Sequence, residues 1–206
     1  MPDLPGEDAG RERERRLAAA VRGRGGVCVL SGGQTGVDTA AAQTALTAGL
    51  AVHLVFPRGL RQEDGLLPAG RRRELRGAVL HELSSPDFGY RTWTCAYLAD
   101  AIVLIDPAGG AGCQETARAA QSLGRPLLDV GRAPMPLPAA EQVAGWLSEV
   151  DARVVMVAGC RGSLLAAAGC GEFADARVAD VIAGAAMWHS RLIRPCGPAE
   201  PRHPPG

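Results

Sequence analysis

The sequence contains few aromatic residues and no excess of charge of either sign. Phe, Trp and Tyr make up 4% of its 206 residues, so the core must consist mainly of Ala, Val and Leu. The 22 Lys and Arg residues equal the 22 Asp and Glu residues in number. Dedicated nucleic-acid-binding proteins usually carry a basic excess, so we expect no nucleic-acid partner.

Long apolar runs are also missing. The apolar stretches have the length of a strand, well short of the roughly 20 residues that a membrane-spanning helix needs. Residues 1–16 are polar and charged and lack the apolar segment of a signal peptide. We therefore expect no membrane association and a cytoplasmic location.

The cysteines show no metal-binding spacing. The sequence contains no C-x-x-C pair, and its four histidines are scattered, so we predict no structural metal. Free thiols are expected in a cytoplasmic protein. The six cysteines are Cys28, Cys95, Cys113, Cys160, Cys170 and Cys196.

Apolar runs and glycines divide the chain into one domain with two tails. Residues 1–24 are predicted to be an exposed, flexible N-terminal arm, in which the alternating Arg and Glu residues could form a helical turn or two and which offers little to bury until Leu17 and Val21. Residues 25–194 contain the domain, with no internal repeat or linker. Residues 195–206 contain five prolines and are predicted to be a disordered tail.

Strand and helix patterns alternate through the domain. This alternation predicts an α/β fold, a doubly wound parallel sheet with helices on both faces. Residues 57–77 are predicted to be a long polar loop of the kind that usually has a function. The predicted strands are residues 27–30, 52–56, 78–83, 101–105, 126–130 and 153–158. The predicted helices are residues 36–48, 90–98, 113–123 and 177–189, with a further helix beginning at Pro138.

A glycine-rich loop, Ser31-Gly32-Gly33-Gln34-Thr35-Gly36-Val37-Asp38, follows the first strand and begins a helix. Backbone N–H groups and the helix dipole can hold an anion at such a place. Glycine would let a phosphate approach the backbone, and Ser31, Gln34 and Thr35 add side-chain donors. The spacing fits neither G-x-G-x-x-G nor a Walker loop. We expect a phosphate site here; the alternative is a tight turn without a ligand. Asp38 would cap N–H groups or bind a hydroxyl.

A second glycine-rich turn, Gly109-Gly110-Ala111-Gly112-Cys113-Gln114-Glu115-Thr116, follows another strand and begins another helix. In an open parallel sheet, two such loops at adjacent strand ends face a common crevice. Gly109, Gly110, Gly112 and Thr116 are therefore candidate ligand residues. Glu115 would hold a ribose hydroxyl or stabilise an oxocarbenium-like transition state; alternatively, it is a favourable acid in the first turn of a helix.

The 57–77 loop supplies charged candidates. Arg58 could clamp a phosphate, while Glu63 and Asp64 could hold a sugar, a pterin amide edge or a metal. The alternative is a solvated loop with weak ion pairs. Arg91 is a further candidate phosphate ligand.

Four blocks in order resemble the molybdenum cofactor carrier proteins. They are SGGQTGVD at 31–38, PRGLRQEDG at 57–65, YRT at 90–92, and VAG with Arg161 and Ser163 at 157–163. The resemblance spans residues 27–165. It implies a Rossmann-like fold, related to the Lonely Guy phosphoribohydrolases and the DNA-processing protein A family. It also implies a homo-oligomer that carries the molybdenum cofactor or another phosphorylated pterin or nucleotide.

The second glycine loop is similar to the GGxGTxEE signature of the Lonely Guy enzymes. Glu115 stands at the first glutamate of that signature, whereas Thr116 replaces the second and Cys113 replaces the threonine. This likeness implies an alternative function, hydrolysis of the N-glycosidic bond of a nucleoside monophosphate with Glu115 as the catalytic residue.

Cysteines stand where the carrier proteins have other residues. Cys95 replaces Asn, Cys113 replaces Thr and Cys160 replaces Pro, all on the expected cleft side. One hypothesis is a functional thiol at Cys113, because a helix N-terminus lowers the pKa of a thiol and thiolates suit a metal-bearing cofactor. The alternative is that these cysteines are small buried core residues.

Overall fold

The computed structural model describes residues 7–23, 25–131 and 140–193. Six parallel strands form the main sheet of this part of the chain, in the order β5-β2-β1-β8-β6-β7. These strands are β1 Cys28–Ser31, β2 Ala51–Phe56, β5 Val79–Glu82, β6 Ala101–Ile105, β7 Leu127–Asp129 and β8 Val154–Gly159. The helices are α1 Glu7–Arg22, α2 Val37–Thr47, α3 Ala69–Glu74, α4 Phe88–Leu98, α5 Ala111–Ser122, α6 Ala140–Glu149, α7 Gly162–Ala168 and α8 Gly171–Ile193.

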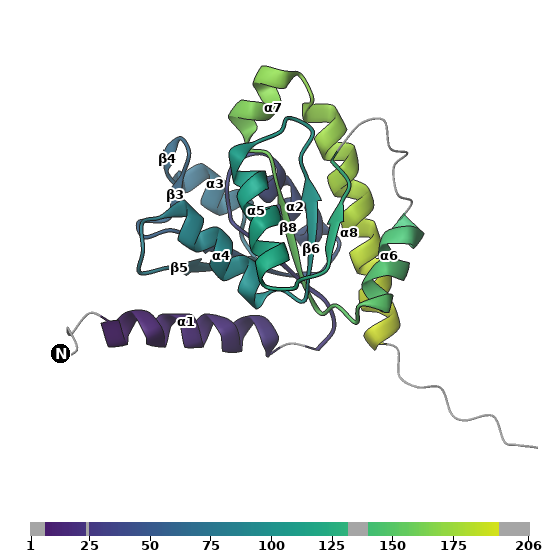
Figure 1. Cartoon of the computed structure of the whole chain (residues 1–206), viewed down its shortest axis with the longest axis horizontal. Coiled ribbons are helices and arrows are strands. Elements are labelled where there is room, and N and C mark those ends of the chain that lie inside the picture. Colours follow the sequence, from purple (N-terminus) through teal and green to yellow (C-terminus); the bar gives the residue numbers. More distant parts are fainter. Residues whose placement is uncertain (1–6, 24, 132–139, 194–206) are drawn as a thin grey trace, which may run out of the picture.

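Helices cover both faces of the sheet (Figure 1). Helices α2, α6 and α8 pack together on one face, and α4 and α5 pack together on the other. Strands β1 and β6 are buried along their whole length, as the continuous apolar runs of a covered parallel strand require. The predicted doubly wound, Rossmann-like α/β fold is confirmed.

Strand β8 lies between β1 and β6. It pairs with β1 at Val29↔Val155 and with β6 at Ile102↔Met156. The two glycine loops are predicted from the sequence to lie at adjacent strand ends, but the end of β8 lies between them. Three loops therefore meet at the carboxyl edge of the sheet, where ligands bind in folds of this class.

The region 57–77 contains more regular structure than the sequence indicates. A small antiparallel hairpin of β3 Arg61–Gln62 and β4 Gly65–Leu66 is followed by α3. These elements escape sequence reasoning because they are short and polar. Helix α7 is likewise short, and its apolar run has no charged opposite face that would show a helical period.

The N-terminal segment differs from the exposed arm that the sequence predicts. Helix α1 runs over 16 residues, and its Leu17 and Val21 are each only 2% exposed. These two residues are one helical turn apart, so they form a narrow apolar stripe within an otherwise charged segment. The Cys28 thiol donates to the Val21 carbonyl at 3.5 Å. The predicted tail 195–206 and Pro138 lie outside the described residues.

The apolar face of α8 is buried within the chain. Val178, Val181, Ile182 and Ala185 are at most 1% exposed, because α8 packs against α2 and α6. This face therefore needs no second copy of the chain to cover it, and the homo-oligomer stays a prediction. No helix in the described ranges is both long and apolar enough to cross a membrane.

The contact between α6 and α8 gives a test of the packing. A Cβ atom at Gly184 would lie 2.6 Å from the Cβ atom of Val143 and 2.7 Å from the Ala140 carbonyl oxygen. We expect G184A to lower the free energy of unfolding by about 1–3 kcal/mol, because the two helices must move apart.

Urea unfolding of the full chain measures this change. Gly145 on α6 is the matched control, since a Cβ atom there meets nothing within 4 Å. G145A should raise the free energy of unfolding by up to about 1 kcal/mol, the difference in helix propensity. A G184A protein as stable as the unsubstituted chain would contradict the packing described here.

Candidate functional site

A cavity of about 590 Å³ lies at the carboxyl edge of the sheet. It is bordered by the loops that follow β1, β6 and β8, by the start of α5 and by one side of α4. Nine of the candidate residues predicted from the sequence line it: Gln34, Asp38, Glu63, Arg91, Gly110, Gly112, Cys113, Glu115 and Thr116. Sequence reasoning thus placed residues far apart in the chain around one cavity.

The other predicted residues do not line this cavity. The Ser31 hydroxyl is buried and donates to the Val157 carbonyl at 2.7 Å. Arg58 and Asp64 are exposed, and Asp64 pairs with Arg71 at 3.4 Å. The remaining members of this group are Gly32, Gly33, Thr35, Gly36 and Gly109.

In the first glycine loop, other parts of the protein occupy the space where a side chain would stand at each of the three glycines. A Cβ atom at Gly32 would lie 1.2 Å from Nη1 of Arg91, and one at Gly33 would lie 2.4 Å from the Phe56 ring. Gly36 has a φ of 76°, and a Cβ atom there would lie 2.5 Å from the Cys160 carbonyl oxygen. The structure therefore gives these glycines a packing reason, whereas the sequence analysis assigns them to the approach of a phosphate.

The hydrogen-bond donors of this loop also bind protein. The Gln34 N–H donates to Asp38 at 3.1 Å, so Asp38 caps a loop N–H, one of its two predicted roles. The Val37 N–H at the start of α2 donates to the Cys160 carbonyl at 3.1 Å. The Thr35 hydroxyl accepts from the Gly162 N–H at 3.0 Å and bonds to Glu63. The polar groups of this loop are thus bonded to other parts of the protein beside the cavity.

Glu63 ties the β3–β4 hairpin to two other segments. Its carboxylate accepts from the Ser163 hydroxyl at 2.5 Å and from the Thr35 hydroxyl, and it pairs with Arg161 at 3.2 Å. Burial raises its pKa, but these hydrogen bonds and the Arg161 charge outweigh burial and lower the pKa from 4.5. Glu63 is therefore a charged anchor of the hairpin at the cavity wall.

The second glycine loop has free space beside Gly112, whereas protein atoms fill the space beside the glycines of the first loop. A Cβ atom at Gly112 would meet nothing within 4 Å, and Ala111 and Gly112 are exposed and line the cavity. They occupy the first turn of α5, where N–H groups have no partner carbonyl within the helix. The start of α5 therefore offers the accessible backbone donors that the sequence analysis expected in the first loop.

Arg91 and Asp38 form a buried pair beside these donors. Their side chains are 10% and 5% exposed, and the contact from Nη1 to Oδ2 is long, at 3.5 Å. The Arg91 Nε is buried and has no hydrogen-bond partner among the described residues. Burial raises the pKa of Asp38 more than the Arg91 charge and the hydrogen bonds to its carboxyl group lower it. With one long contact and a buried Nε that lacks a partner among the described residues, Arg91 keeps hydrogen-bonding capacity for a further anion.

Glu115 lies on the cavity wall with both carboxylate oxygens engaged. It accepts from the Trp93 indole N–H at 2.6 Å and pairs with Arg118. A carboxylate oxygen retains a second lone pair, so Glu115 can still accept a hydrogen bond from a ligand. The structure shows an oriented acid here.

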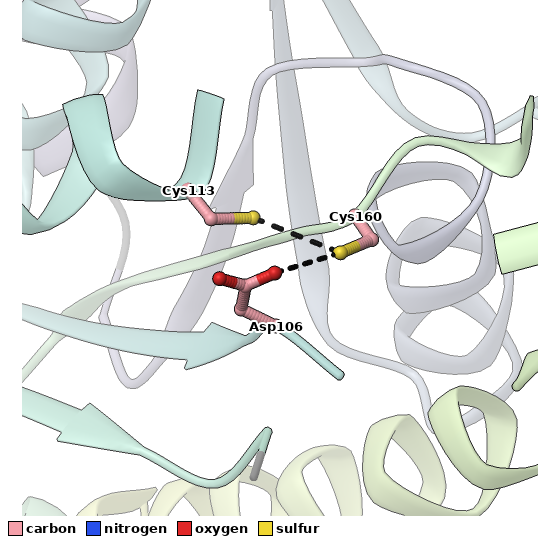
Figure 2. Close-up of side chains that lie close together, drawn as sticks. All are labelled: Asp106, Cys113 and Cys160. Carbon is pink, nitrogen blue, oxygen red and sulfur yellow. Dashed lines mark hydrogen bonds between the residues drawn. The ribbon is translucent and has the colours of Figure 1, made fainter. Parts of the chain in front are cut away.

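The structure corrects the expected thiol chemistry. Burial, aided by Asp106, raises the pKa of the Cys113 thiol above its usual range instead of lowering it. Cys95 is fully buried and does not line the cavity, and burial raises its pKa to about 12. Cys113 and Cys160 do line the cavity, and together with Asp106 they form a group able to hold a metal ion (Figure 2).

Several residues of the site were not found from the sequence. Asp106, Trp93 and Arg161 come from three different segments, and only proximity in the fold relates them to Cys160, Glu115 and Glu63. Asp106 could have been found, because it ends a strand directly before the second glycine loop. Trp93 carries no such signal.

A second cavity, of about 550 Å³, lies between α1 and α4. Its lining includes Tyr90, Trp93, Tyr97 and Leu98, and it contains none of the glycine-loop residues. Because the glycine loops and the buried Arg91 lie at the sheet edge, we place the candidate functional site there.

Comparison with known protein families assigns the chain to a family. The model of the circularly permutated YpsA SLOG family matches residues 29–180, which include the sheet and the three loops that border the cavity. The chain therefore belongs to this family.

A solved structure shares the fold. It is from Syntrophus aciditrophicus and is described as a putative molybdenum carrier protein. The two chains are 22% identical, and the match has a TM-score of 0.61 and covers 78% of this chain and 98% of the other. Comparison with curated protein sequences gives no match. The family match bears out the family resemblance that the motifs indicated, and the neighbour confirms the fold.

The buried Asp38 predicts a pH dependence of stability. Its pKa is raised in the folded protein, so the folded state binds the proton more tightly than the unfolded chain, whose value is 3.8. The free energy of unfolding therefore falls as the pH rises from 3.8 through the folded pKa. We expect D38N, which lacks this titration, to gain stability relative to the unsubstituted chain over that interval.

Urea unfolding at a series of pH values measures the difference. D175N, at an exposed position of α8, is the control and should follow the unsubstituted chain. A stability difference between D38N and the unsubstituted chain that stays constant with pH would show that burial does not raise the pKa of Asp38.

Proposed function

We propose that this chain binds a phosphate-bearing small molecule in the sheet-edge cavity, in the manner of a molybdenum cofactor carrier. The observation that carries the proposal is the Arg91 guanidinium, which lines the cavity, is 8% exposed and has one long contact with Asp38. A buried charge is costly unless it is paired. A phosphate would supply a further negative charge and short, charge-assisted hydrogen bonds.

The start of α5 supports an anion in the same cavity. Ala111 and Gly112 present N–H groups at the positive end of a 12-residue helix. Gly112 leaves room for an anion to approach the backbone, because no described atom lies within 4 Å of its Cβ position. A phosphate held by these N–H groups and by Arg91 would lie between α4 and α5.

The size and the acids of the cavity favour a ligand larger than phosphate. Its volume of about 590 Å³ falls within the range of roughly 300–1,000 Å³ typical of small-molecule sites. Glu63 and Glu115 are carboxylate acceptors on its walls, suited to the hydroxyl groups of a sugar or the amide edge of a pterin. A phosphorylated pterin, such as the molybdenum cofactor, or a nucleotide meets both requirements.

Thermal unfolding with added phosphate, adenosine monophosphate or molybdopterin tests the binding. A ligand at about 100 times its Kd stabilises the folded state by about 2.7 kcal/mol. We expect R91Q to weaken binding by at least about tenfold, because it loses a charged hydrogen bond. The control R72Q, at an exposed position of α3, should bind as the unsubstituted chain does.

Two results would overturn the proposal. One is the absence of stabilisation by all three compounds. The other is an R91Q protein that unfolds cooperatively and binds with unchanged affinity. Unfolding of R91Q without ligand, measured in the same experiment, shows whether the variant is folded.

The alternative is a hydrolase that cleaves a nucleoside monophosphate, and it is favoured by the oriented Glu115 carboxylate. The carrier proposal predicts that the base–ribose bond of a bound nucleotide stays intact, which chromatography of the products measures. Free base released by the unsubstituted chain and lost in E115Q, with binding retained, would establish the hydrolase and overturn the carrier.

A further inference from the structure

Two thiols that line the cavity lie close to one carboxylate (Figure 2). Asp106 follows β6, Cys113 lies in the first turn of α5, and Cys160 follows β8. The two Sγ atoms are 4.0 Å apart, and Cys160 Sγ is 2.9 Å from Asp106 Oδ1. All three potential ligand atoms lie within 4.8 Å of one another. The fold thus builds a compact group from three separate segments.

The backbone holds this group in place. Asp106 Oδ1 also accepts from the Gly110 N–H at 3.0 Å, which orients the carboxylate. The Cys160 N–H donates to the Ile105 carbonyl at 3.2 Å, and the Cys113 N–H donates to the Gly110 carbonyl at 3.0 Å. Outer hydrogen bonds of this kind orient the ligands of metal sites.

We propose that Asp106, Cys113 and Cys160 form a binding site for a borderline-soft divalent cation such as Zn²⁺. Two thiolates and one carboxylate are ligands that Zn²⁺ accepts, whereas Mg²⁺ and Ca²⁺ prefer oxygen ligands alone. Binding replaces the two thiol protons, which leave to solvent, and forms two metal–sulfur bonds and one metal–oxygen bond.

The distance between the two sulfur atoms is close to the one that a tetrahedral ion requires. With metal–sulfur bonds of about 2.3 Å, a tetrahedral angle places two thiolates about 3.8 Å apart, close to the 4.0 Å between Cys113 and Cys160. A sulfur and a carboxylate oxygen would be about 3.6 Å apart, so Asp106 and Cys160 must separate from their present 2.9 Å. A small rotation of the Asp106 side chain provides this change.

The site leaves one coordination position for a further ligand. Three protein ligands leave a tetrahedral ion with a fourth position for water or another molecule. Cys113 and Cys160 line the same cavity as Gly112 and Glu115, so the ion would lie where a bound anion could reach it. The inference goes beyond the proposed function and does not require it, because Arg91 is not among the metal ligands.

Titration of the reduced full chain with Co²⁺ tests the site. Co²⁺ takes the place of Zn²⁺ and reports thiolate ligation through sulfur-to-metal charge-transfer absorption in the near ultraviolet and tetrahedral bands in the visible. We expect both signals to saturate at one ion per chain and to be abolished by added Zn²⁺. C113S and C160S should each weaken the charge-transfer band, because one thiolate remains, and the double variant C113S/C160S should lose it. D106N should weaken Co²⁺ binding by at least about tenfold, since loss of a ligand costs at least as much as loss of the outer hydrogen bonds that orient it.

C170S is the matched control and should bind Co²⁺ as the unsubstituted chain does. Thermal unfolding without metal shows whether each variant is folded, and D106N keeps both thiols if a cysteine variant is not. The proposal is overturned if the reduced chain gives no charge-transfer band, or if the band persists in the folded double variant C113S/C160S. Phosphate binding that depends on Arg91 would survive either result, so the two proposals fail separately.

Discussion

The guanidinium of Arg91 lies across Gly32, and the arrangement of the site depends on this contact. A side chain at Gly32 would occupy the position of Arg91 Nη1. Only glycine therefore allows the Arg91 side chain of α4 to cross the first loop and reach Asp38 on α2. The buried pair positions α4, the loop and α2 more than it stabilises the fold, because the cost of removing two charges from water offsets much of their attraction. Through it, α4, the loop and α2 hold a positive charge at a set position beside the start of α5.

The two glycine loops have different tasks, although both connect a strand to a helix. In the first, Arg91, Phe56 and the Cys160 carbonyl occupy the space beside the glycines. In the second, Gly112 is open to the cavity. The loop after β8 joins them, since its Cys160 carbonyl accepts from Val37 at the start of α2 and its Cys160 thiol contacts Asp106. Accessible backbone donors are thus concentrated on the α5 side of the cavity.

Charge in the cavity is arranged as three arginine–carboxylate pairs with different surroundings. Arg118–Glu115 and Arg161–Glu63 have exposed arginines, so water screens them and they contribute little to stability. Arg91–Asp38 is buried and long, and burial favours the neutral form of Asp38. The longest of the three contacts is therefore also the most buried one. The thiols of Cys113 and Cys160 add soft donors beside Gly110.

The sequence by itself determined the parallel α/β class and most strand positions, because covered strands need continuous apolar runs. It also indicated nine residues around the cavity, seven of them in the two glycine loops, because strand-to-helix loops gather at one sheet edge. Only the tertiary structure decided which glycines are packed and which are open, since that depends on side chains such as Phe56 from other strands. It also decided that β8 separates the two loops. The pKa of Cys113 and its meeting with Asp106 and Cys160 likewise depend on burial and on segments distant in the chain, which local spacing does not encode.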